Sequence, residues 1–278
     1  MNLLHVVNIS FVLPYFIGKQ FLYFHQNGYN EYVICSPSDE LSEFAQEYQF
    51  RYKEVDILRK ISIRKDIRAI VSIMKYINQN HIDIVTGHTP KGALLAMISA
   101  YIMQVPIRIY FRHGLVYETS KGLKRFLLIS MDKLAAKLAT KIVCVSPSVC
   151  KRSIEDKLNP ASKQVLLSKG TCNGIDISRF DRQNIQSEAV QNLKDKLDLP
   201  EQCFVVGFIG RLVRDKGIIE LVQAFTLLRQ KYSDVRLLLV GMLEERDALP
   251  ETIVKDIRKN PAIITTGYVQ NSIIENYY

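Results

Sequence analysis

The chain has 278 residues, of which 47% are hydrophobic and 23% charged, and it carries a formal net charge of +9. This composition is typical of a globular protein with one large or two ordinary domains, and it excludes an intrinsically disordered chain. Residues 1–200 hold 27 Lys and Arg against 18 Asp and Glu, whereas residues 201–278 hold ten of each. The surplus in the first part indicates an anionic partner, such as a membrane surface, a phosphorylated lipid or a nucleic acid. An ordinary solvated basic surface is the alternative.

Strand-like and helix-like segments alternate through the first part of the chain. The predicted strands are 3–9, 31–35, 82–86, 107–111, 142–146 and 165–168, and the predicted helices are 14–27, 39–48, 63–80, 90–103 and 121–140. We expect Asp39 to cap the second of these helices. This alternation predicts a mostly parallel sheet covered by helices on both faces, as in a Rossmann-like domain over residues 1–172.

The order of strands and helices resumes after a polar stretch at 173–200, which we interpret as a linker leading into a second domain. Strands are predicted at 204–209, 235–240 and 263–266, with helices at 218–232 and near 245–259. The sequence therefore predicts an α/β protein of two Rossmann-like domains, the second over residues 201–278.

Cysteine usage and hydrophobic runs bear on the compartment. The odd set of five cysteines has no CxxC spacing, which predicts neither a zinc site nor a disulfide framework: Cys35, Cys144, Cys150, Cys172 and Cys203. The N-terminal residues read as a strand and not as a signal peptide. The longest apolar run, 93–103, is shorter than the roughly 20 residues that a spanning helix needs. We expect a cytoplasmic protein that can bind peripherally to the inner face of the membrane.

A short charged loop separates the predicted strand at 204–209 from the helix that follows it. The loop contains Gly210, Arg211, Lys216 and Gly217. N–H groups at a helix N-terminus lack intrahelical partners and attract anions, and the two cations strengthen that attraction. The loop suits a diphosphate, although a plain turn with two solvated cations fits the local pattern equally well.

Ligands of open α/β sheets bind beyond the carboxyl ends of the strands, and polar residues of the first part stand at such places. Gly18 follows the first strand, where a glycine either lets the backbone approach a phosphate or sugar, or serves packing. His113, which precedes Gly114, follows the strand at 107–111. A histidine at this place is a candidate site residue, with a structural role as the alternative.

His88 and Lys91 stand at the start of the predicted helix at 90–103. A cation at a helix N-terminus opposes the helix dipole, so Lys91 is poorly explained as a stabilising residue. We therefore expect Lys91 to bind a ligand.

The predicted helix at 121–140 has a basic and amphipathic pattern. Its leucines recur at helical spacing among cations: Leu123, Leu127, Leu134 and Leu138, with Lys124, Arg125, Lys133, Lys137 and Lys141. Such a helix can bind anionic lipid, or its apolar stripe can pack on the sheet in the ordinary way.

Six segments stand in one order along essentially the whole chain: Gly18-Lys-Gln, His88-Thr-Pro-Lys91, Arg108-Ile-Tyr-Phe-Arg-His113-Gly114-Leu, Cys144-Val-Ser-Pro-Ser148, Asn173-Gly-Ile-Asp176 and Gly210-Arg211-Leu-Val-Arg-Asp-Lys216-Gly217. In this order and spacing the chain resembles the family 4 glycosyltransferases of the two-domain GT-B fold. It is most similar to the bacterial branch that builds capsular polysaccharide, O-antigen, lipopolysaccharide and lipid-linked oligosaccharides.

The resemblance implies transfer of a sugar from a nucleotide diphosphate donor, with retention of anomeric configuration and without a metal or other cofactor. Arg211 and Lys216 match residues that clamp the diphosphate and neutralise the leaving group, which makes them catalytic as well as donor-binding. Gly210 and Gly217 belong to the same donor loop, and Gly18 matches a glycine beside the diphosphate.

On the acceptor side, His113 matches a histidine near the reacting sugar and is expected to be catalytic and to contact acceptor groups. His88 and Lys91 are expected to bind the acceptor. UDP is the expected nucleotide because it is frequent in the family, and an N-acetylhexosamine is among the expected sugars. A lipid-linked or polysaccharide acceptor is implied, and a lipid diphosphate at the inner leaflet would also explain the basic first part.

The family pattern extends further than this sequence. Members usually continue for about another hundred residues, which supply a Glu-rich motif that holds the donor sugar and ribose. We therefore expect a second domain that is incomplete, and a chain that retains the acceptor domain and half of the donor site with reduced or no turnover.

Other functions compete with this interpretation. A GT-B sugar-nucleotide epimerase is one alternative, and a non-catalytic membrane-associated fragment is another. No GxGxxG follows the first strand, which disfavours a nicotinamide-dependent dehydrogenase. The basic residues lack the aromatic interleaving of nucleic-acid binders, so we expect no nucleic-acid partner.

Overall fold

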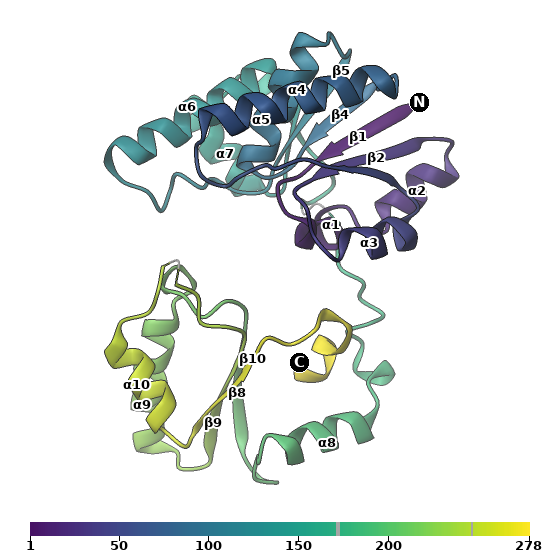
Figure 1. Cartoon of the computed structure of the whole chain (residues 1–278). Helices are drawn as coiled ribbons and strands as arrows, with labels where there is room; N and C mark the ends of the chain where they lie inside the picture. Colours follow the sequence, from purple (N-terminus) through teal and green to yellow (C-terminus); the bar gives the residue numbers. More distant parts are fainter. Residues whose placement is uncertain (171–172, 246) are drawn as a thin grey trace. The chain divides into compact units, whose positions relative to one another are not determined.

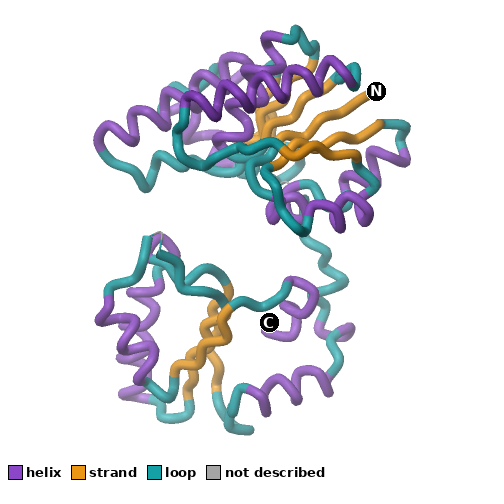
Figure 2. The backbone as a smooth tube through the Cα atoms, in the orientation of Figure 1, coloured by secondary structure: helices purple, strands orange, loops and turns teal. Residues whose placement is uncertain are grey.

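The protein divides into two compact units, Met1–Gly174 and Ile175–Tyr278, in a computed structural model that describes residues 1–170, 173–245 and 247–278 (Figure 1). Each unit is an α/β structure with its strands inside and its helices outside (Figure 2). The α/β prediction with mostly parallel sheets is confirmed. One of the five cysteines, Cys172, lies outside the described residues.

The first unit contains a seven-stranded sheet in the order β3-β2-β1-β4-β5-β6-β7, and every neighbouring pair is parallel. The strands are β1 (Asn2–Val6), β2 (Asn30–Cys35), β3 (Arg51–Glu54), β4 (Ile84–Gly87), β5 (Ile107–Arg112), β6 (Lys141–Cys144) and β7 (Gln164–Leu166). The chain reverses the direction in which it adds strands between β1 and β4. At such a switch point the connections diverge and leave the carboxyl ends of the strands accessible to ligands.

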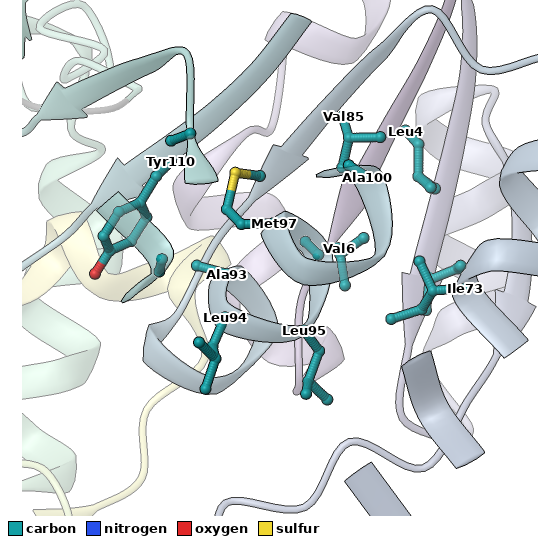
Figure 3. Packing of buried hydrophobic residues seen from close by; sticks show 14 of the residues in the cluster. Leu4, Val6, Ile73, Val85, Ala93, Leu94, Leu95, Met97, Ala100 and Tyr110 are labelled. Atoms are coloured by element: carbon teal, nitrogen blue, oxygen red, sulfur yellow. The ribbon is translucent and has the colours of Figure 1, made fainter. Parts of the chain in front are cut away.

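Helices cover both faces of this sheet. They are the short 3-10 helices η1 (Ser10–Val12) and η2 (Ala161–Lys163), and α1 (Leu13–Phe16), α2 (Gln20–Gln26), α3 (Leu41–Tyr48), α4 (Ile63–Gln79), α5 (Pro90–Ile102), α6 (Gly122–Leu138) and α7 (Pro147–Glu155). Side chains alternate along a strand, so β1 supplies both cores. Leu4 and Val6 pack with Ile73 of α4 and Met97 of α5, as Figure 3 shows. The opposite core, under α1 to α3, includes Phe21 and Val33.

The second unit has a three-stranded parallel sheet in the order β10-β9-β8. Its elements are η3 (Arg182–Asn184), α8 (Ser187–Lys196), β8 (Phe204–Ile209), η4 (Arg214–Lys216), α9 (Ile218–Lys231), β9 (Val235–Val240), α10 (Glu251–Lys259), β10 (Ile263–Gly267) and η5 (Asn271–Tyr277). The helices α9 and α10 lie along one face of this sheet (Figure 1). Their apolar residues pack on it, among them Val222 and Ile257. An ion pair between Arg179 and Glu275 joins the two ends of the unit.

Several predicted elements need correction. The helix predicted at 14–27 is two short helices, because Gly18 adopts a φ of +50° between them. Asp39 does not cap α3, whose first turn is preceded by Glu40 without any side-chain cap. The polar edge strand β3 and the helix α7 were not predicted. The stretch at 173–200 contains the helix α8.

Candidate functional site

Three histidines, one threonine and one glutamate form a continuous hydrogen-bonded chain across the first sheet, which we call the histidine chain: Glu31, His5, Thr86, His88 and His113. Glu31 Oε1 lies 3.3 Å from His5 Nε2, and His5 Nδ1 lies 2.7 Å from Thr86 Oγ1. Thr86 Oγ1 lies 3.2 Å from His88 Nε2, and His88 Nδ1 lies 3.1 Å from His113 Nε2. The histidine chain runs from the interior of the sheet to the carboxyl end of β5.

Parallel register places these side chains together. His5 of β1 is paired with Val33 of β2 and with Thr86 of β4. Glu31 lies two residues before Val33 and therefore projects from the same face of the sheet as His5. The turn after β4 carries His88, whose backbone N–H donates to Val6 O. Residues far apart in sequence thus meet because their strands are neighbours.

Burial keeps the histidine chain uncharged near neutral pH. Loss of solvation lowers the pKa of His5 to about 3 and the pKa of His113 to about 4. It also holds the pKa of His88 well below the ordinary value, and the neighbouring His113 and His5 add to that effect. Burial raises the pKa of Glu31 to about 8. The contact between His5 and Glu31 is therefore a neutral hydrogen bond and not an ion pair.

His113 is the member of the chain that can meet a ligand. Its ring stacks on Phe16 of α1, with centroids 3.7 Å apart and an interplanar angle of 12°. Its Nε2 is bonded to His88, whereas its Nδ1 has no hydrogen-bond partner among the described residues. This nitrogen is buried as well as unpartnered, so a polar ligand group that reached it, such as a sugar hydroxyl, would satisfy it.

The geometry argues against direct acceptor contacts by His88 and Lys91. His88 is 1% exposed, its ring stacks on Phe111, and both of its nitrogens are bonded within the protein. Lys91 is buried and its Nζ lies 2.5 Å from Asp66 Oδ2. The premise that Lys91 lacks a structural explanation is wrong, because the sequence did not show that α4 supplies a counterion.

Packing within the first unit requires a glycine at position 18. At its φ of +50° an added Cβ would lie 2.5 Å from both Asn173 Nδ2 and Pro14 O. The Gly18 N–H donates to Leu13 O at 3.0 Å. Its predicted place beside a diphosphate stays a prediction.

In the second unit the charged loop follows β8 as predicted. Gly217 adopts a φ of +72° and precedes α9, whose first-turn N–H groups lack intrahelical acceptors. Lys216 is exposed and forms no ion pair with a described residue, whereas Arg211 Nη1 lies 3.1 Å from Glu244 Oε2. Both partners of that pair are about 40–50% exposed, so the pair contributes only about 0–1 kcal/mol and an anion can displace it.

Gly241, which was not among the predicted site residues, shapes the same loop. It directly follows β9 and lies beside Gly210, and a Cβ there would lie 1.9 Å from Gly210 O. Its φ is +146°, and Gly210 has a φ of +151°. Two glycines at the ends of adjacent strands therefore allow a close backbone approach, and the pair of apolar strands each ending in glycine was the available sequence pattern.

The described residues contain no group of His, Cys, Asp or Glu arranged to hold a metal ion. In the same part of the chain, no helix combines the length and apolar character that crossing a bilayer requires.

Comparisons with known proteins agree with this architecture. A family model described as "Glycosyl transferase 4-like" matches residues 4–146, and one described as "Glycosyl transferases group 1" matches residues 189–278. A capsular polysaccharide biosynthesis glycosyltransferase, CapM of Staphylococcus aureus, is 31% identical over 98% of this chain and 69% of its own length. A UDP-Gal:alpha-D-GlcNAc-diphosphoundecaprenol alpha-1,3-galactosyltransferase of Escherichia coli is 26% identical over 69% of this chain and 48% of its own length.

Solved structures share the fold at low sequence identity. Anabaena Alr3699/HepE in complex with UDP-glucose has a TM-score of 0.75 at 16% identity, covering 99% of this chain and 71% of that one. The UDP-GlcNAc 2-epimerase of Neisseria meningitidis has a TM-score of 0.65 at 13% identity, covering all of this chain and 75% of that one.

Proposed function

The chain belongs to the glycosyltransferases, with a 4-like first part and a group 1 second part, and we propose that it transfers a sugar from a UDP-linked donor to a lipid-linked or polysaccharide acceptor with retention of configuration. The observation that carries this proposal is the loop between β8 and α9. It combines Arg211, Lys216 and a helix N-terminus, all of which attract a diphosphate.

In this proposal Arg211 and Lys216 bind the donor diphosphate and stabilise the charge that develops on the leaving UDP. Exchange of the Arg211–Glu244 pair for a phosphate costs little because the pair is exposed. His113 contacts a hydroxyl of the transferred sugar through Nδ1 and helps to orient it. The leaving phosphate can accept the proton of the acceptor hydroxyl.

The proposed acceptor lies at the inner face of the cytoplasmic membrane, and α4 and α6 support that location. Both helices follow strands of the parallel sheet and flank α5, so both begin at its carboxyl edge. On α4, Ile63, Ile67 and Val71 are 73%, 55% and 45% exposed at four-residue spacing. Leu123 and Phe126 of α6 are 74% and 65% exposed.

Exposed cations lie close in sequence to these apolar side chains, on the two helices and directly before α6: Arg64, Lys65, Arg68, Lys75, Lys121 and Lys124. The combination of exposed apolar residues and cations is typical of helices that lie in an anionic lipid interface. The membrane-binding surface that we propose consists of these residues of α4 and α6. A lipid-linked acceptor, as in the name of the Escherichia coli relative, would be held at this same edge of the sheet.

The experiment that tests this function incubates the full chain with a panel of UDP-sugars and an undecaprenyl diphosphate-linked monosaccharide, and follows the products by mass spectrometry. We expect the acceptor to gain one sugar, with retained configuration by NMR, and the gain to disappear in Arg211→Ala. Because the chain also shares its fold with a 2-epimerase, the experiment has a second informative outcome. Acceptor-independent formation of a 2-epimer of the donor would replace the transferase proposal with an epimerase.

A further inference from the structure

The histidine chain has two ends, and Glu31 is the carboxyl group at one of them. Among the described residues, no further charged side chain hydrogen-bonds or stacks with it. The groups that face it are Phe21 of α2 against His5, Phe111 of β5 against His88, and Phe16 of α1 against His113. At one end Glu31 Oε2 has no partner among the described residues, and at the other end His113 Nδ1 has none.

Thr86 Oγ1 also lies 3.4 Å from Leu4 O, which can accept the hydroxyl proton. When that proton instead stays within the histidine chain, each internal link holds one proton and the hydrogen bonds all run in the same direction. If Glu31 Oε1 carries a proton, it donates to His5 Nε2, and His5 Nδ1–H donates to Thr86 Oγ1. The Thr86 hydroxyl then donates to His88 Nε2, and His88 Nδ1–H donates to His113 Nε2. His113 is left with its proton on Nδ1, and it therefore presents a donor to a ligand.

The reverse direction follows when Glu31 Oε1 is an acceptor. His113 Nε2–H then donates to His88 Nδ1, and each following link is reversed as far as His5 Nε2–H, which donates to Glu31. His113 now has a lone pair on Nδ1. The same nitrogen that faces the ligand thus changes from donor to acceptor.

We propose that Glu31 is a positioning residue for His113: through the histidine chain, protonation of Glu31 decides whether His113 Nδ1 donates a hydrogen bond to a ligand or accepts one. The assignment of a sugar hydroxyl as that ligand rests on the proposed function. The link between Glu31 and His113 rests on the hydrogen bonds alone.

The proton count balances without any further reactant. When Glu31 is ionised and a proton binds at His113 Nδ1, the Nε2 proton of His113 passes to His88 Nδ1 and that of His88 Nε2 passes to Thr86 Oγ1. The Thr86 proton passes to His5 Nδ1, and the His5 Nε2 proton converts the Glu31 carboxylate to the acid. One proton enters and one carboxylate is neutralised, so each histidine is neutral before and after the transfer.

The raised pKa of Glu31, about 8, puts the change of direction at mildly alkaline pH. Below that pH Glu31 is the acid and His113 Nδ1 is a donor. Above it Glu31 is ionised and His113 Nδ1 is an acceptor. The lowered pKa values of His5 and His113 keep doubly protonated rings out of the chain throughout this range.

Nitrogen NMR tests the proposal without any substrate. The full chain labelled with ¹⁵N-histidine is titrated from about pH 6 to pH 9.5, and two-bond ¹H–¹⁵N correlations report which ring nitrogen of His113 carries the proton. His113→Asn identifies the signals. We expect Nδ1 to change from a protonated to an unprotonated nitrogen with a midpoint near the pKa of Glu31, about 8, while Nε2 changes in the opposite sense.

Glu31→Gln supplies the decisive comparison, because glutamine retains the hydrogen bond to His5 but cannot ionise. We expect His113 to keep one tautomer across the whole range in this variant. The matched control is Glu54→Gln on the exposed strand β3, which should titrate as the unaltered protein does. If Glu31→Gln does not fold, Thr86→Val removes the shortest link and leaves only the contact of 3.3 Å between His5 Nδ1 and His88 Nε2, so the midpoint of the transition should shift.

A His113 tautomer that does not change with pH in the unaltered protein would overturn the proposal, as would an unchanged midpoint in Glu31→Gln. Because the measurement contains no sugar, its failure leaves the transferase proposal standing. Conversely, a protein that proves inactive as a transferase can still show the coupling between Glu31 and His113.

Discussion

The Nζ atom of Lys91, at the start of α5, lies 2.5 Å from Oδ2 of Asp66 in the first turn of α4, and the two side chains are only 6% and 16% exposed. The charge that opposes the dipole of α5 is therefore compensated by an acid from the neighbouring helix. Removal of either partner leaves a buried charge without a counterion. Lys91 stabilises the packing of α4 against α5.

We accordingly predict that Lys91→Ala lowers the free energy of unfolding of the first unit by about 3 kcal/mol, as expected for breaking a buried pair. Urea titration measures the change. Lys75→Ala, on the exposed side of α4, is the matched control and should stay within about 0.5 kcal/mol of the unaltered protein. A stable Lys91→Ala that loses only acceptor binding would instead support the acceptor role expected from the sequence.

The stability of the first unit should depend on pH in both directions. The buried histidines have lowered pKa values, so the unfolded chain binds protons below its ordinary pKa of 6.5 before the folded chain does, and the free energy of unfolding falls as pH falls below about 6.5. Glu31 acts oppositely, because the unfolded chain releases its proton near pH 4.5 and the folded chain near pH 8. Below pH 6.5 the stability lost through up to three histidines is larger than the stability gained through Glu31, so the free energy of unfolding falls as the pH falls.

The predicted stability maximum therefore lies near pH 6.5, with a decline of at most about 1.4 kcal/mol per pH unit from there to about pH 8. Urea titrations followed through the histidine ring signals of the first unit measure it. In Glu31→Gln the alkaline decline should flatten, whereas the acidic decline should remain. Stability that rises steadily from pH 6.5 to 8 in the unaltered protein would show that Glu31 is ionised in the folded state.

The close approach of Gly210 and Gly241 yields a prediction about the donor loop. Gly241→Ala would place a Cβ 1.9 Å from Gly210 O, so the backbone that leads into Arg211 must move. We expect UDP affinity to fall on the order of tenfold, which corresponds to about 1.4 kcal/mol. Calorimetric titration with UDP measures it.

Gly267→Ala is the control for that variant. Gly267 also has a positive φ, +71°, but nothing lies within 4 Å of an added Cβ. The control carries a similar backbone strain without the collision, and its UDP affinity should be nearly unchanged. Equal losses in both variants would assign the effect to strain in the second sheet and not to the loop.

The proposed membrane-binding surface predicts lipid binding that depends on α4. Replacement of Ile63 and Ile67 by Asp should reduce sedimentation with phosphatidylglycerol vesicles severalfold, because it removes exposed apolar area and adds negative charge. Leu227→Asp, on the exposed side of α9, is the control. Vesicle binding that is unaffected by the α4 variant would place the lipid contact elsewhere or exclude it.

Continuous apolar runs allowed much of the fold to be predicted. The strands at 204–209 and 235–240 have the predicted bounds because each run ends at a glycine that the backbone requires. The break at Gly18 was missed, since apolar periodicity continues across it while the positive φ does not permit a helix. The strand β3 was missed because its residues are polar and three of the four are exposed.

The candidate site was predictable only in part. His113 and the loop with Arg211 follow strand ends, and this position is visible in the sequence. His5 and Glu31 lie within or at the start of apolar strands, and only the register of β1 against β2 and β4 brings them to His88. A polar residue inside an apolar strand was the available indication, and it does not name its partner.

Calorimetric titration of the full chain with UDP tests the central claim most directly, because it needs neither the sugar nor the acceptor. We predict binding that weakens about ten- to a hundredfold in Arg211→Ala and in Lys216→Ala, since each charge-assisted hydrogen bond contributes about 1.5–3 kcal/mol. Arg258→Ala, which removes an exposed cation from α10 of the same unit, should bind as the unaltered protein does. A folded protein whose UDP affinity is the same in all three variants would contradict a diphosphate site in the loop between β8 and α9.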